Sequence, residues 1–301
     1  MPETTIIDAH VHLWDPAAIR IPWLDGVDLL NRPLGLREYD DQTWGINVVA
    51  IVYVQVDAVP EDGLREIHWV VEHAREDRHM AGIVAWAPLE HGAGVRPYLA
   101  ELVAISPKVK GVRRLIQSEP DPTFCLQPHF VRGVQLLPEY GLSFDLGITH
   151  HQLTQTIALV RQCRETQFIL DHLGKPDIAG HVPEPWRREL SELAELPNVM
   201  CKISGVVTAA DHAGWTDEEL APYVAHALAV FGEDRVVFGS DWPVCLLASS
   251  YLRWVDTLDA LTAQLAPLAR EKLWRENACR FYRLPEYGDD ASSEQSDQAS
   301  T

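Results

Sequence analysis

The sequence predicts an α/β fold, a single-domain (β/α)8 TIM barrel, and three observations lead to this expectation. The chain has 301 residues, which suits one barrel, since such domains run to ~250 residues or more. Short apolar runs rich in β-branched residues alternate along the chain with longer amphipathic stretches. Eight such runs can be counted, and eight strand-then-helix units favour a closed barrel over an open sheet.

The predicted strands are nearly continuous apolar runs. This pattern is typical of parallel strands, because both of their faces are covered. The strands are predicted at residues 5–13, 48–56, 80–86, 109–116, 142–148, 168–172, 199–203 and 236–239.

Helical patterns lie between the strands. In residues 63–79, Leu64, Ile67, Val70 and Val71 recur at helical spacing, with charged residues on the other face. A last helix is expected to close the structure. The remaining helices are predicted at residues 95–105, 130–140, 153–165, 186–196, 218–231, 251–265 and 268–282.

Two regions break the alternation. Residues 14–37 contain Pro16, Pro22 and Pro33, and we expect a long loop there, over the mouth of the barrel. Residues 286–301 are mostly Gly, Asp, Ser, Glu and Gln, with almost nothing to bury, so the sequence predicts an acidic, disordered C-terminal tail. The barrel domain is therefore expected to span residues 1–285.

Composition and charge narrow the classes of partner. The formal net charge is −19, and an acidic surface repels phosphate backbones and anionic lipid. We therefore expect no nucleic-acid or membrane partner. The net charge says little about a small-molecule substrate, because the charge of a pocket can differ from the net charge, and a homo-oligomer stays open. The five cysteines are scattered, which favours reduced thiols. The first residues lack the pattern of a secretory signal, and we expect a cytoplasmic protein.

Two histidines end the first predicted strand. His10 and His12 lie two residues apart, so their side chains point the same way and can hold one metal ion. Taken alone, this pair is more simply interpreted as two polar residues at the end of a strand. The pair lies at the carboxyl end of the first strand, however, where the active sites of barrels lie, and this position favours a metal site.

Two further ligand-type residues end later strands. His172 ends the sixth predicted strand, and Gly174 and Pro176 then force a turn; alone, His172 could be a histidine of the core. Asp241 follows the eighth apolar run, where a carboxylate is costly unless it is paired or bound to a metal. It could instead cap a helix that begins at Pro243. Because strands one, six and eight deliver such residues to one rim, we expect a common site.

The motifs that carry these residues resemble a known family. In order along the chain, the segments IIDAHVHLWDP, GVRRLIQ, LDHLGKP, CKISG and FGSDWPV are similar to those of the amidohydrolase superfamily, and within it to the branch of sugar-lactone and related lactone hydrolases. The resemblance extends from about Ile6 to Leu284. It implies a hydrolase that opens a lactone ring, most simply that of a sugar acid, in carbohydrate metabolism.

The resemblance also implies roles for the four ligand-type residues. His10, His12, His172 and Asp241 would hold one divalent metal ion, for which we expect zinc. Asp241 would be the base that activates water, and Asp241 or His172 would return a proton to the departing ring oxygen. A two-metal site is not expected, because the lysine that would bridge two metals at the end of strand four is absent, and Lys110 lies too early on that strand.

Substrate-binding residues are predicted beside this centre. By resemblance, Arg113, and with it Arg114, would hold the carbonyl or carboxyl end of the substrate. Because neighbouring residues on a strand alternate in direction, only one of the two can enter the mouth. Trp14, Trp23 and Trp242 flank the motifs, and an indole can stack on a sugar ring, although core packing explains them equally well.

Some alternatives stay open at this point. His150 and His151 follow the fifth strand, where other amidohydrolases place a metal ligand, and a solvated loop pair is the simpler interpretation. A decarboxylase of the same superfamily would use the same His-x-His and Asp set. A barrel that binds a sugar acid without turning it over is the second alternative.

Overall fold

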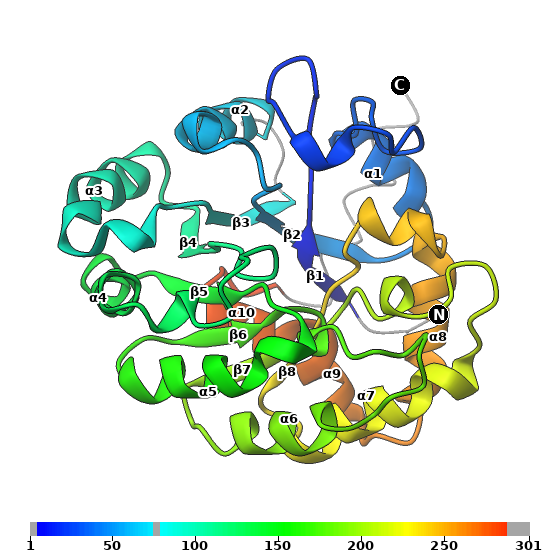
Figure 1. The fold of residues 1–301 in the computed structure, drawn as a ribbon. Coiled ribbons are helices and arrows are strands. Elements are labelled where there is room, and N and C mark those ends of the chain that lie inside the picture. The colour runs from blue at the N-terminus through cyan, green and yellow to red at the C-terminus, as the bar shows by residue number, and fades with distance from the viewer. Residues whose placement is uncertain (1–4, 75–78, 288–301) are drawn as a thin grey trace, which may run out of the picture.

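Eight parallel strands form one sheet in the computed structural model, which describes residues 5–74 and 79–287. The strands are hydrogen-bonded in chain order, β1 to β8, and each neighbouring pair is parallel. Figure 1 shows the ring that the strands form, with the helices around it. The strands are β1 (Ile6–Val11), β2 (Val48–Val54), β3 (Met80–Ala85), β4 (Val109–Val112), β5 (Ser143–Leu146), β6 (Phe168–Leu170), β7 (Val199–Ile203) and β8 (Val236–Phe238).

The first and last strands close the ring. Val11 forms a parallel bridge with Trp242. The backbone N–H of His12 donates to the carbonyl of Trp242 at 2.7 Å, and that of Asp241 donates to the carbonyl of His10 at 2.9 Å. The single-domain (β/α)8 barrel predicted from the sequence is confirmed.

The helices form an outer layer around the strands (Figure 1). Most of them start within two residues of the predicted positions. The last predicted helix is broken into α9, a π-helical segment (Lys272–Glu276) and α10. The helices are α1 (Leu36–Thr43), α2 (Gly63–His73), α3 (Arg96–Ile105), α4 (Pro128–Leu136), α5 (Leu153–Gln162), α6 (Trp186–Ala194), α7 (Asp217–Phe231), α8 (Tyr251–Leu261), α9 (Pro267–Glu271) and α10 (Asn277–Tyr282).

Helix α1 was not predicted from the sequence. Its eight residues, LREYDDQT, bury only Tyr39 and Thr43, so the segment lacks an apolar stripe that could be recognised. The preceding loop is as expected up to residue 35: besides turns, it contains a short 3-10 helix, Pro22–Leu24, and an isolated antiparallel bridge between Trp14 and Leu34.

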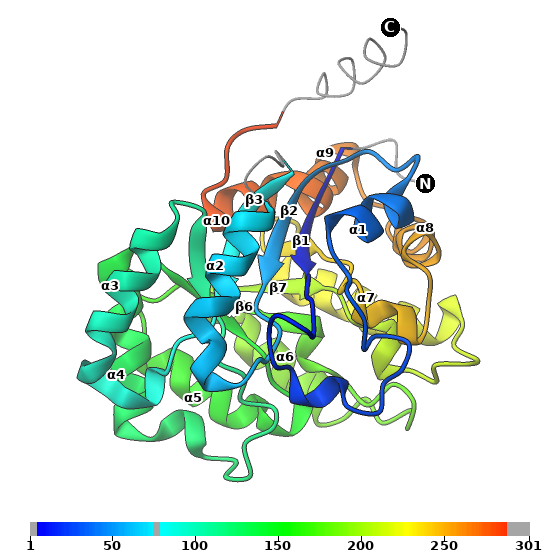
Figure 2. The ribbon, with the colours of Figure 1, turned by 90° about the horizontal axis from the view of Figure 1, so that it is seen from above.

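A small apolar core lies inside the barrel and is closed at one end by α10. Ala278, Phe281 and Tyr282 of this helix belong to the same buried cluster as Ile7 and Val52 of the first two strands. Figure 2 shows α10 at the end where the strands begin, with the strands running away from it. The other end of the barrel, where the strands finish, is therefore the end left for a site.

No helix among the described residues is long and apolar enough to cross a membrane. The predicted tail lies, from residue 288 onward, outside the described residues. Its disorder and the domain boundary at residue 285 stay predictions.

Candidate active site

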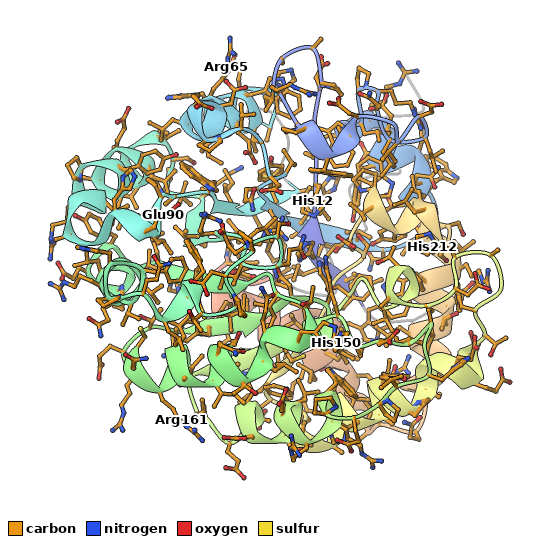
Figure 3. All side chains as sticks on the ribbon, viewed as in Figure 1. His12, Arg65, Glu90, His150, Arg161 and His212 are labelled. Atoms are coloured by element: carbon orange, nitrogen blue, oxygen red, sulfur yellow. The ribbon has the colours of Figure 1, made fainter. Side chains whose placement is uncertain are left out.

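A bulge in β1 directs His10 and His12 into the barrel. Asp8 pairs with Ile51 and Val11 pairs with Tyr53, so three steps along β1 match two steps along β2. One extra residue reverses the facing of a strand. Asp8 consequently faces outward to the helices, while His10 and His12 face the barrel axis. Figure 3 shows His12 near the centre of the molecule, whereas the labelled Arg65 and Arg161 lie at its periphery.

The hydroxyl of Tyr39 in α1 confirms the outward direction of Asp8, because it donates to the Asp8 carboxylate at 2.9 Å. The backbone N–H of Ser240 donates to the other oxygen of Asp8 at 2.8 Å. Burial raises the pKa of Asp8 to about 6. Asp8 therefore ties β1 to α1 and to the end of β8, and so supports the two histidines from outside the barrel.

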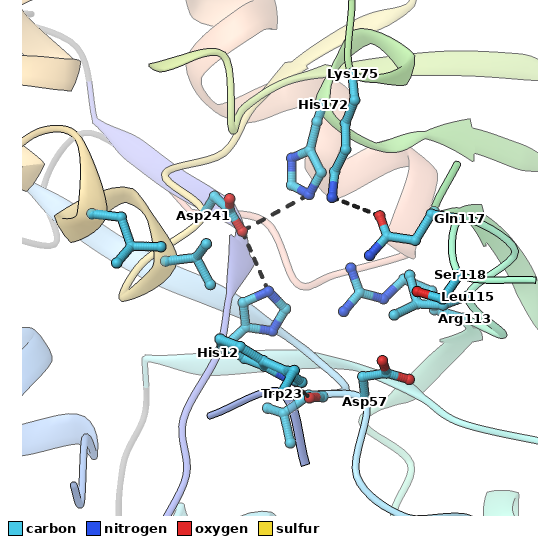
Figure 4. Close-up of a pocket in the computed structure, with 14 residues that line it drawn as sticks. His12, Trp23, Asp57, Arg113, Leu115, Gln117, Ser118, His172, Lys175 and Asp241 are labelled. Atoms are coloured by element: carbon cyan, nitrogen blue, oxygen red, sulfur yellow. Dashed lines mark hydrogen bonds and ion pairs between the residues drawn. The ribbon is translucent and has the colours of Figure 1, made fainter. Parts of the chain in front are cut away.

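The other residues of the site lie in turns whose backbone adopts left-handed φ values. His172, Leu173, Gly174 and Lys175 follow β6 with φ values of 54°, 55°, 72° and 50°. Asp241, after β8, has a φ of 61°. Non-glycine residues adopt this region at a cost of ~1–3 kcal/mol each, and such residues gather at functional sites. The turn after β6 brings the side chains of His172 and Lys175 to the same pocket (Figure 4).

The four predicted ligand residues converge. The Oδ1 atom of Asp241 lies 3.4 Å from Nε2 of His12, 3.7 Å from Nε2 of His10 and 3.8 Å from Nε2 of His172. The Nε2 atoms of His10 and His12 are 3.2 Å apart. All four side chains are buried, and Figure 4 shows Asp241 between His12 and His172.

This geometry fits a single divalent ion. The Nδ1–H of His12 donates to the carbonyl of Val54 at 2.7 Å, which leaves the Nε2 lone pair facing the site. Nδ1 of His172 is likewise held, by the hydroxyl of Ser204 at 2.9 Å. Ligands at ~2.0–2.1 Å from a tetrahedral zinc ion lie ~3.3 Å from one another, close to the distances between His10, His12 and Asp241.

A second group of ligand-type residues, His10, Asp171 and His172, already has its charge balanced by the protein. One oxygen of Asp171 lies 2.9 Å from Nζ of Lys202, and the other lies 3.2 Å from a guanidinium nitrogen of Arg113. Two cationic side chains therefore already neutralise this carboxylate, which disfavours a second metal ion here.

Burial sets the protonation of the site. It lowers the pKa of His172 to about 4, and it lowers the pKa of His12 and, with Lys202 nearby, that of His10. Burial alone would raise the pKa of Asp241, but the neighbouring imidazoles of His172, His12 and His10 outweigh it and hold that pKa below its ordinary value. At neutral pH the group is therefore one carboxylate and three neutral imidazoles, the form that binds a metal ion.

The four-residue centre opens into a pocket of about 300 Å³, within the range of small-molecule sites. One part of the wall is apolar, and another part is polar or charged. The apolar part is formed by Trp23, Val56, Leu115, Val244 and Leu247, and the polar part by His12, Asp57, Arg113, Gln117, Ser118, His172, Lys175 and Asp241.

The two arginines predicted to bind substrate lie in different environments. Arg113 lines the pocket, and its guanidinium group contacts Asp171 and the carbonyl of Gln55. Arg114 does not line this pocket; its guanidinium group pairs with Glu90 at 3.0 Å and with Glu119 at 2.6 Å. The alternation expected along strand four accounts for this difference, and the structure offers no substrate contact for Arg114.

Of the three predicted tryptophans, only Trp23 lines this pocket. Its indole N–H donates to the carbonyl of Val56 at 2.7 Å. Trp14 and Trp242 are fully buried, and Trp14 donates to the carbonyls of two loop residues. These two pack in the core, which was the alternative interpretation. The imidazoles of His150 and His151 lie outside this pocket, and His150 contacts the carbonyl of Lys175.

Sequence reasoning missed several polar residues of the pocket. Lys175 lies in the LDHLGKP motif, three residues after His172, and this proximity could have indicated it. Gln117 and Ser118 follow the arginine pair on the same loop. Asp57 has a φ of 58°, and nothing in the sequence around it marks that conformation.

Comparison with known proteins agrees with the fold and identifies the family. The amidohydrolase family model matches residues 7–284. An L-fucono-1,5-lactonase from Burkholderia multivorans is 34% identical, with 94% of this chain and 97% of that protein aligned. An L-rhamnono-gamma-lactonase from Scheffersomyces stipitis is 25% identical, over 94% of this chain and all of that protein. A crystal structure of an amidohydrolase from Burkholderia multivorans with bound zinc has a TM-score of 0.84 and 32% identity, over 94% of this chain and all of that one. The chain therefore belongs to the amidohydrolase family of hydrolases.

Proposed function

We propose that the protein hydrolyses the lactone ring of a sugar acid, with Asp241 as the base that activates water. The observation that carries the proposal is the convergence of the Asp241 carboxylate and three neutral imidazoles at the floor of a pocket that also holds two cationic side chains. The two lactonases similar to this chain support the class of substrate.

In the proposed reaction, a water molecule beside Asp241 loses a proton to the carboxylate and its oxygen attacks the lactone carbonyl carbon. The bond between that carbon and the ring oxygen then breaks. The ring oxygen takes up the proton, delivered by Asp241 or through His172, and leaves as a hydroxyl group. The product is an open-chain hydroxy acid. Because the pKa of Asp241 is low, the carboxylate is ionised at neutral pH and holds the proton only briefly.

Arg113 and Lys175 are proposed to stabilise the negative charge that develops on the carbonyl oxygen. Both line the pocket. Nζ of Lys175 donates to Oε1 of Gln117 at 2.6 Å, which leaves further N–H groups for a substrate oxygen. A donor aimed at such an oxygen typically contributes a few kcal/mol, about 10²–10³ in turnover.

We propose zinc as the ion held by His10, His12, His172 and Asp241. When bound, it would supply a Lewis acid that polarises an oxygen of the water or the substrate. The residues of the chain orient this centre: Val54 and Ser204 fix the rings of His12 and His172.

The pocket wall supports a sugar rather than a flat aromatic substrate. A sugar ring presents C–H groups on its faces and hydroxyl groups around its edge. Trp23 and Leu247 offer an apolar surface for the former, whereas Asp57, Gln117 and Ser118 offer acceptors and donors for the latter. Trp23 is the one predicted indole in position to stack on such a ring.

The experiment is a pH-indicator screen of the purified, metal-analysed protein against paired 1,4- and 1,5-lactones of several sugar acids. We expect acid release with a narrow stereochemical set, and a product heavier than the substrate by one water. Asp241→Asn protein is the control for acid released without the enzyme. If CO₂ appears without incorporation of water, a decarboxylase is indicated. Binding of a sugar acid with no turnover of any lactone would contradict the proposal and leave a binding protein.

A further inference from the structure

One charged group in the wall of the candidate active site has no partner in the protein. Asp57 lies three residues after the end of β2 and lines the pocket together with Asp241, Arg113 and Lys175. The other three charged groups each have a protein partner, an imidazole, a carboxylate and an amide oxygen respectively. The carboxylate of Asp57 forms no hydrogen bond or ion pair within the part of the chain that the structure describes, so its two oxygens are available to a ligand.

The backbone of Asp57 has a conformation that non-glycine residues seldom adopt. Its φ is 58°, in the left-handed region. The N–H of Asp57 donates to the side-chain oxygen of Gln55, and the N–H of Val56 donates to the carboxylate of Glu66 at 2.9 Å. Strained positions of this kind persist only where the surrounding contacts fix them, and they gather at functional sites. Because Gln55 and Glu66 are fully buried, the direction in which the side chain of Asp57 leaves the backbone is fixed by the core.

Trp23 is held at the same wall by the same peptide group. Its indole N–H donates to the carbonyl of Val56 at 2.7 Å, and that carbonyl belongs to the peptide that contains the N–H of Asp57. Figure 4 shows Trp23 and Asp57 on one side of the pocket, and Lys175 with Gln117 on the other. A sugar ring presents C–H groups to the face of an indole and hydroxyl groups at its edge. An ionised carboxylate accepts through two oxygens, so beside an indole it suits two neighbouring hydroxyl groups.

The charge of Asp57 bears on the edge of the substrate that lies away from its carbonyl group. In the proposed reaction Arg113 and Lys175 bind the carbonyl oxygen, so the opposite edge would lie against the wall of Trp23 and Asp57. A carboxylate on that edge would place a second negative charge beside Asp57, and repulsion between like charges excludes partners of the wrong charge. Burial raises the pKa of Asp57, whereas the nearby charges of Arg113 and Lys175 favour its ionised form.

We propose that Asp57 is a specificity-determining residue. Its carboxylate accepts hydrogen bonds from two neighbouring hydroxyl groups of a neutral sugar lactone whose ring stacks on Trp23, and it repels lactones that carry a carboxylate away from the ring carbonyl. The inference rests on the proposed function, because it takes the substrate to be a lactone, and it adds the charge and the recognised groups of that substrate. Aspartate also occurs at left-handed positions for structural reasons alone, and the experiment must separate the two roles.

The test compares two lactones of the same ring configuration. One is the neutral lactone of an aldonic acid, and the other is the monolactone of the corresponding aldaric acid, which carries a carboxylate at its last carbon. Asp57→Asn keeps the shape of the side chain, tolerates left-handed backbone and removes the charge. We expect kcat/KM for the neutral lactone to fall about 10- to 100-fold, because hydrogen bonds to a charged group are lost, and to fall mainly through KM. For the aldaric lactone kcat/KM should rise.

Glu61→Gln is the matched control, because it removes a negative charge from the same loop at an exposed position outside the pocket. The ratio of kcat/KM for the neutral lactone to that for the aldaric lactone should stay unchanged in this control. In Asp57→Asn the ratio should fall by at least about tenfold. A folded Asp57→Asn protein whose ratio stays within about threefold of wild type overturns the proposal, and so does an equal change of the ratio in Glu61→Gln.

A second measurement does not depend on the folding of a variant. Wild-type protein should prefer the neutral lactone, and deoxy lactones that lack either hydroxyl of the recognised pair should be poorer substrates. A preference for the aldaric lactone overturns the proposal. If wild-type protein turns over neither lactone, the proposed function fails by itself, and calorimetry with the unconsumed lactones then measures the same preference as binding. A wild type that binds neither lactone, or an Asp57→Asn protein that binds both as wild type does, overturns the role of Asp57.

Discussion

The ammonium group of Lys175 donates a hydrogen bond to the side-chain oxygen of Gln117 at 2.6 Å, across the pocket between the turn after β6 and the loop after β4 (Figure 4). Burial lowers the pKa of Lys175, and the hydrogen bond orients its Nζ atom within the pocket. The pair joins two loops that come from non-neighbouring strands.

Replacing Lys175 should therefore weaken the stabilisation of the charge that develops on the carbonyl oxygen. Lys175→Met removes one charged donor from the polar wall, so turnover should fall by about 10²- to 10³-fold. Arg114→Met is the matched control, since Arg114 is a cation of the same segment as Arg113 that pairs with Glu90 outside the pocket. Equal losses in the two variants would contradict the proposed contact.

Removing the charge of Asp241 should abolish most turnover without unfolding the protein. Asparagine keeps the shape of the side chain and tolerates the left-handed backbone at this position, where φ is 61°. We expect Asp241→Asn to lose turnover by at least ~10²-fold, while its melting curve shows a folded protein. Zinc content measured in parallel separates the loss of a base from the loss of a ligand. Turnover close to that of wild type would exclude Asp241 as the base.

Gly205, in the loop after β7, controls the placement of His172. A Cβ atom at this position would lie 2.5 Å from Nδ1 of His172 and 3.1 Å from Asp241, and φ is +56°. Gly205→Ala should lower both stability and activity, because the imidazole must move. Gly141→Ala is the control: φ is +67° there too, but nothing lies within 4 Å of the added carbon.

The control should lose only the ~1 kcal/mol that a left-handed alanine costs, with normal kcat/KM for the folded fraction. Chemical unfolding and steady-state kinetics of both variants make the comparison. Should Gly205→Ala behave like Gly141→Ala in both measurements, the close contact with His172 would be irrelevant to function.

Glu66 should make stability depend on pH. Its Oε1 accepts from the hydroxyl of Tyr53 at 2.7 Å and from the backbone of Val56 at 2.9 Å, and burial raises its pKa from 4.5 to about 7. The folded protein thus binds the proton more tightly than the unfolded chain. This contribution to stability, roughly 3 kcal/mol, is complete below about pH 4.5 and is lost as the pH rises through about 7.

Glu66→Gln removes this dependence, because the amide oxygen keeps both hydrogen bonds and carries no charge. Between about pH 5 and about pH 8.5, the free energy of unfolding of the variant should rise relative to wild type by ~1–3 kcal/mol, as measured by urea unfolding. Glu61→Gln, at an exposed position in the short helical turn Pro60–Asp62, should show no such change. A difference that stays constant with pH would mean that Glu66 is ionised throughout.

The architecture was predictable because buried parallel strands leave long apolar runs in a sequence. The same property made the predicted ends of the strands inexact. The fourth strand was predicted to extend to Ile116, whereas β4 ends at Val112, because most of the residues after the strand are buried as well. Helix α1 could not be recognised, because its fixed position depends on Tyr39 reaching Asp8 and not on an apolar stripe.

The centre of the candidate site was predictable for a different reason. His10 lies near the end of its strand and His12, His172 and Asp241 come just after theirs, and the carboxyl ends of all strands in a barrel meet at one rim. Lys175 and Asp57 depend on left-handed backbone, which local sequence does not specify for such residues. Lys202 was overlooked within an apolar strand because its partners are distant in the sequence: Asp145 lies on β5 and Asp171 directly follows β6, and only the closed ring brings them together.

The hydroxyl of Tyr282, in α10, contacts the carboxylate of Asp145 that pairs with Lys202, and Lys202 contacts His10 in the first strand. A chain that is still being synthesised therefore contains all four ligand-type residues before it contains the helix that closes the barrel beneath them. Domains fold as units, and contacts between the two ends of a chain form late because they close the longest loop. The enzyme should accordingly gain its organised centre only after α10 has left the ribosome.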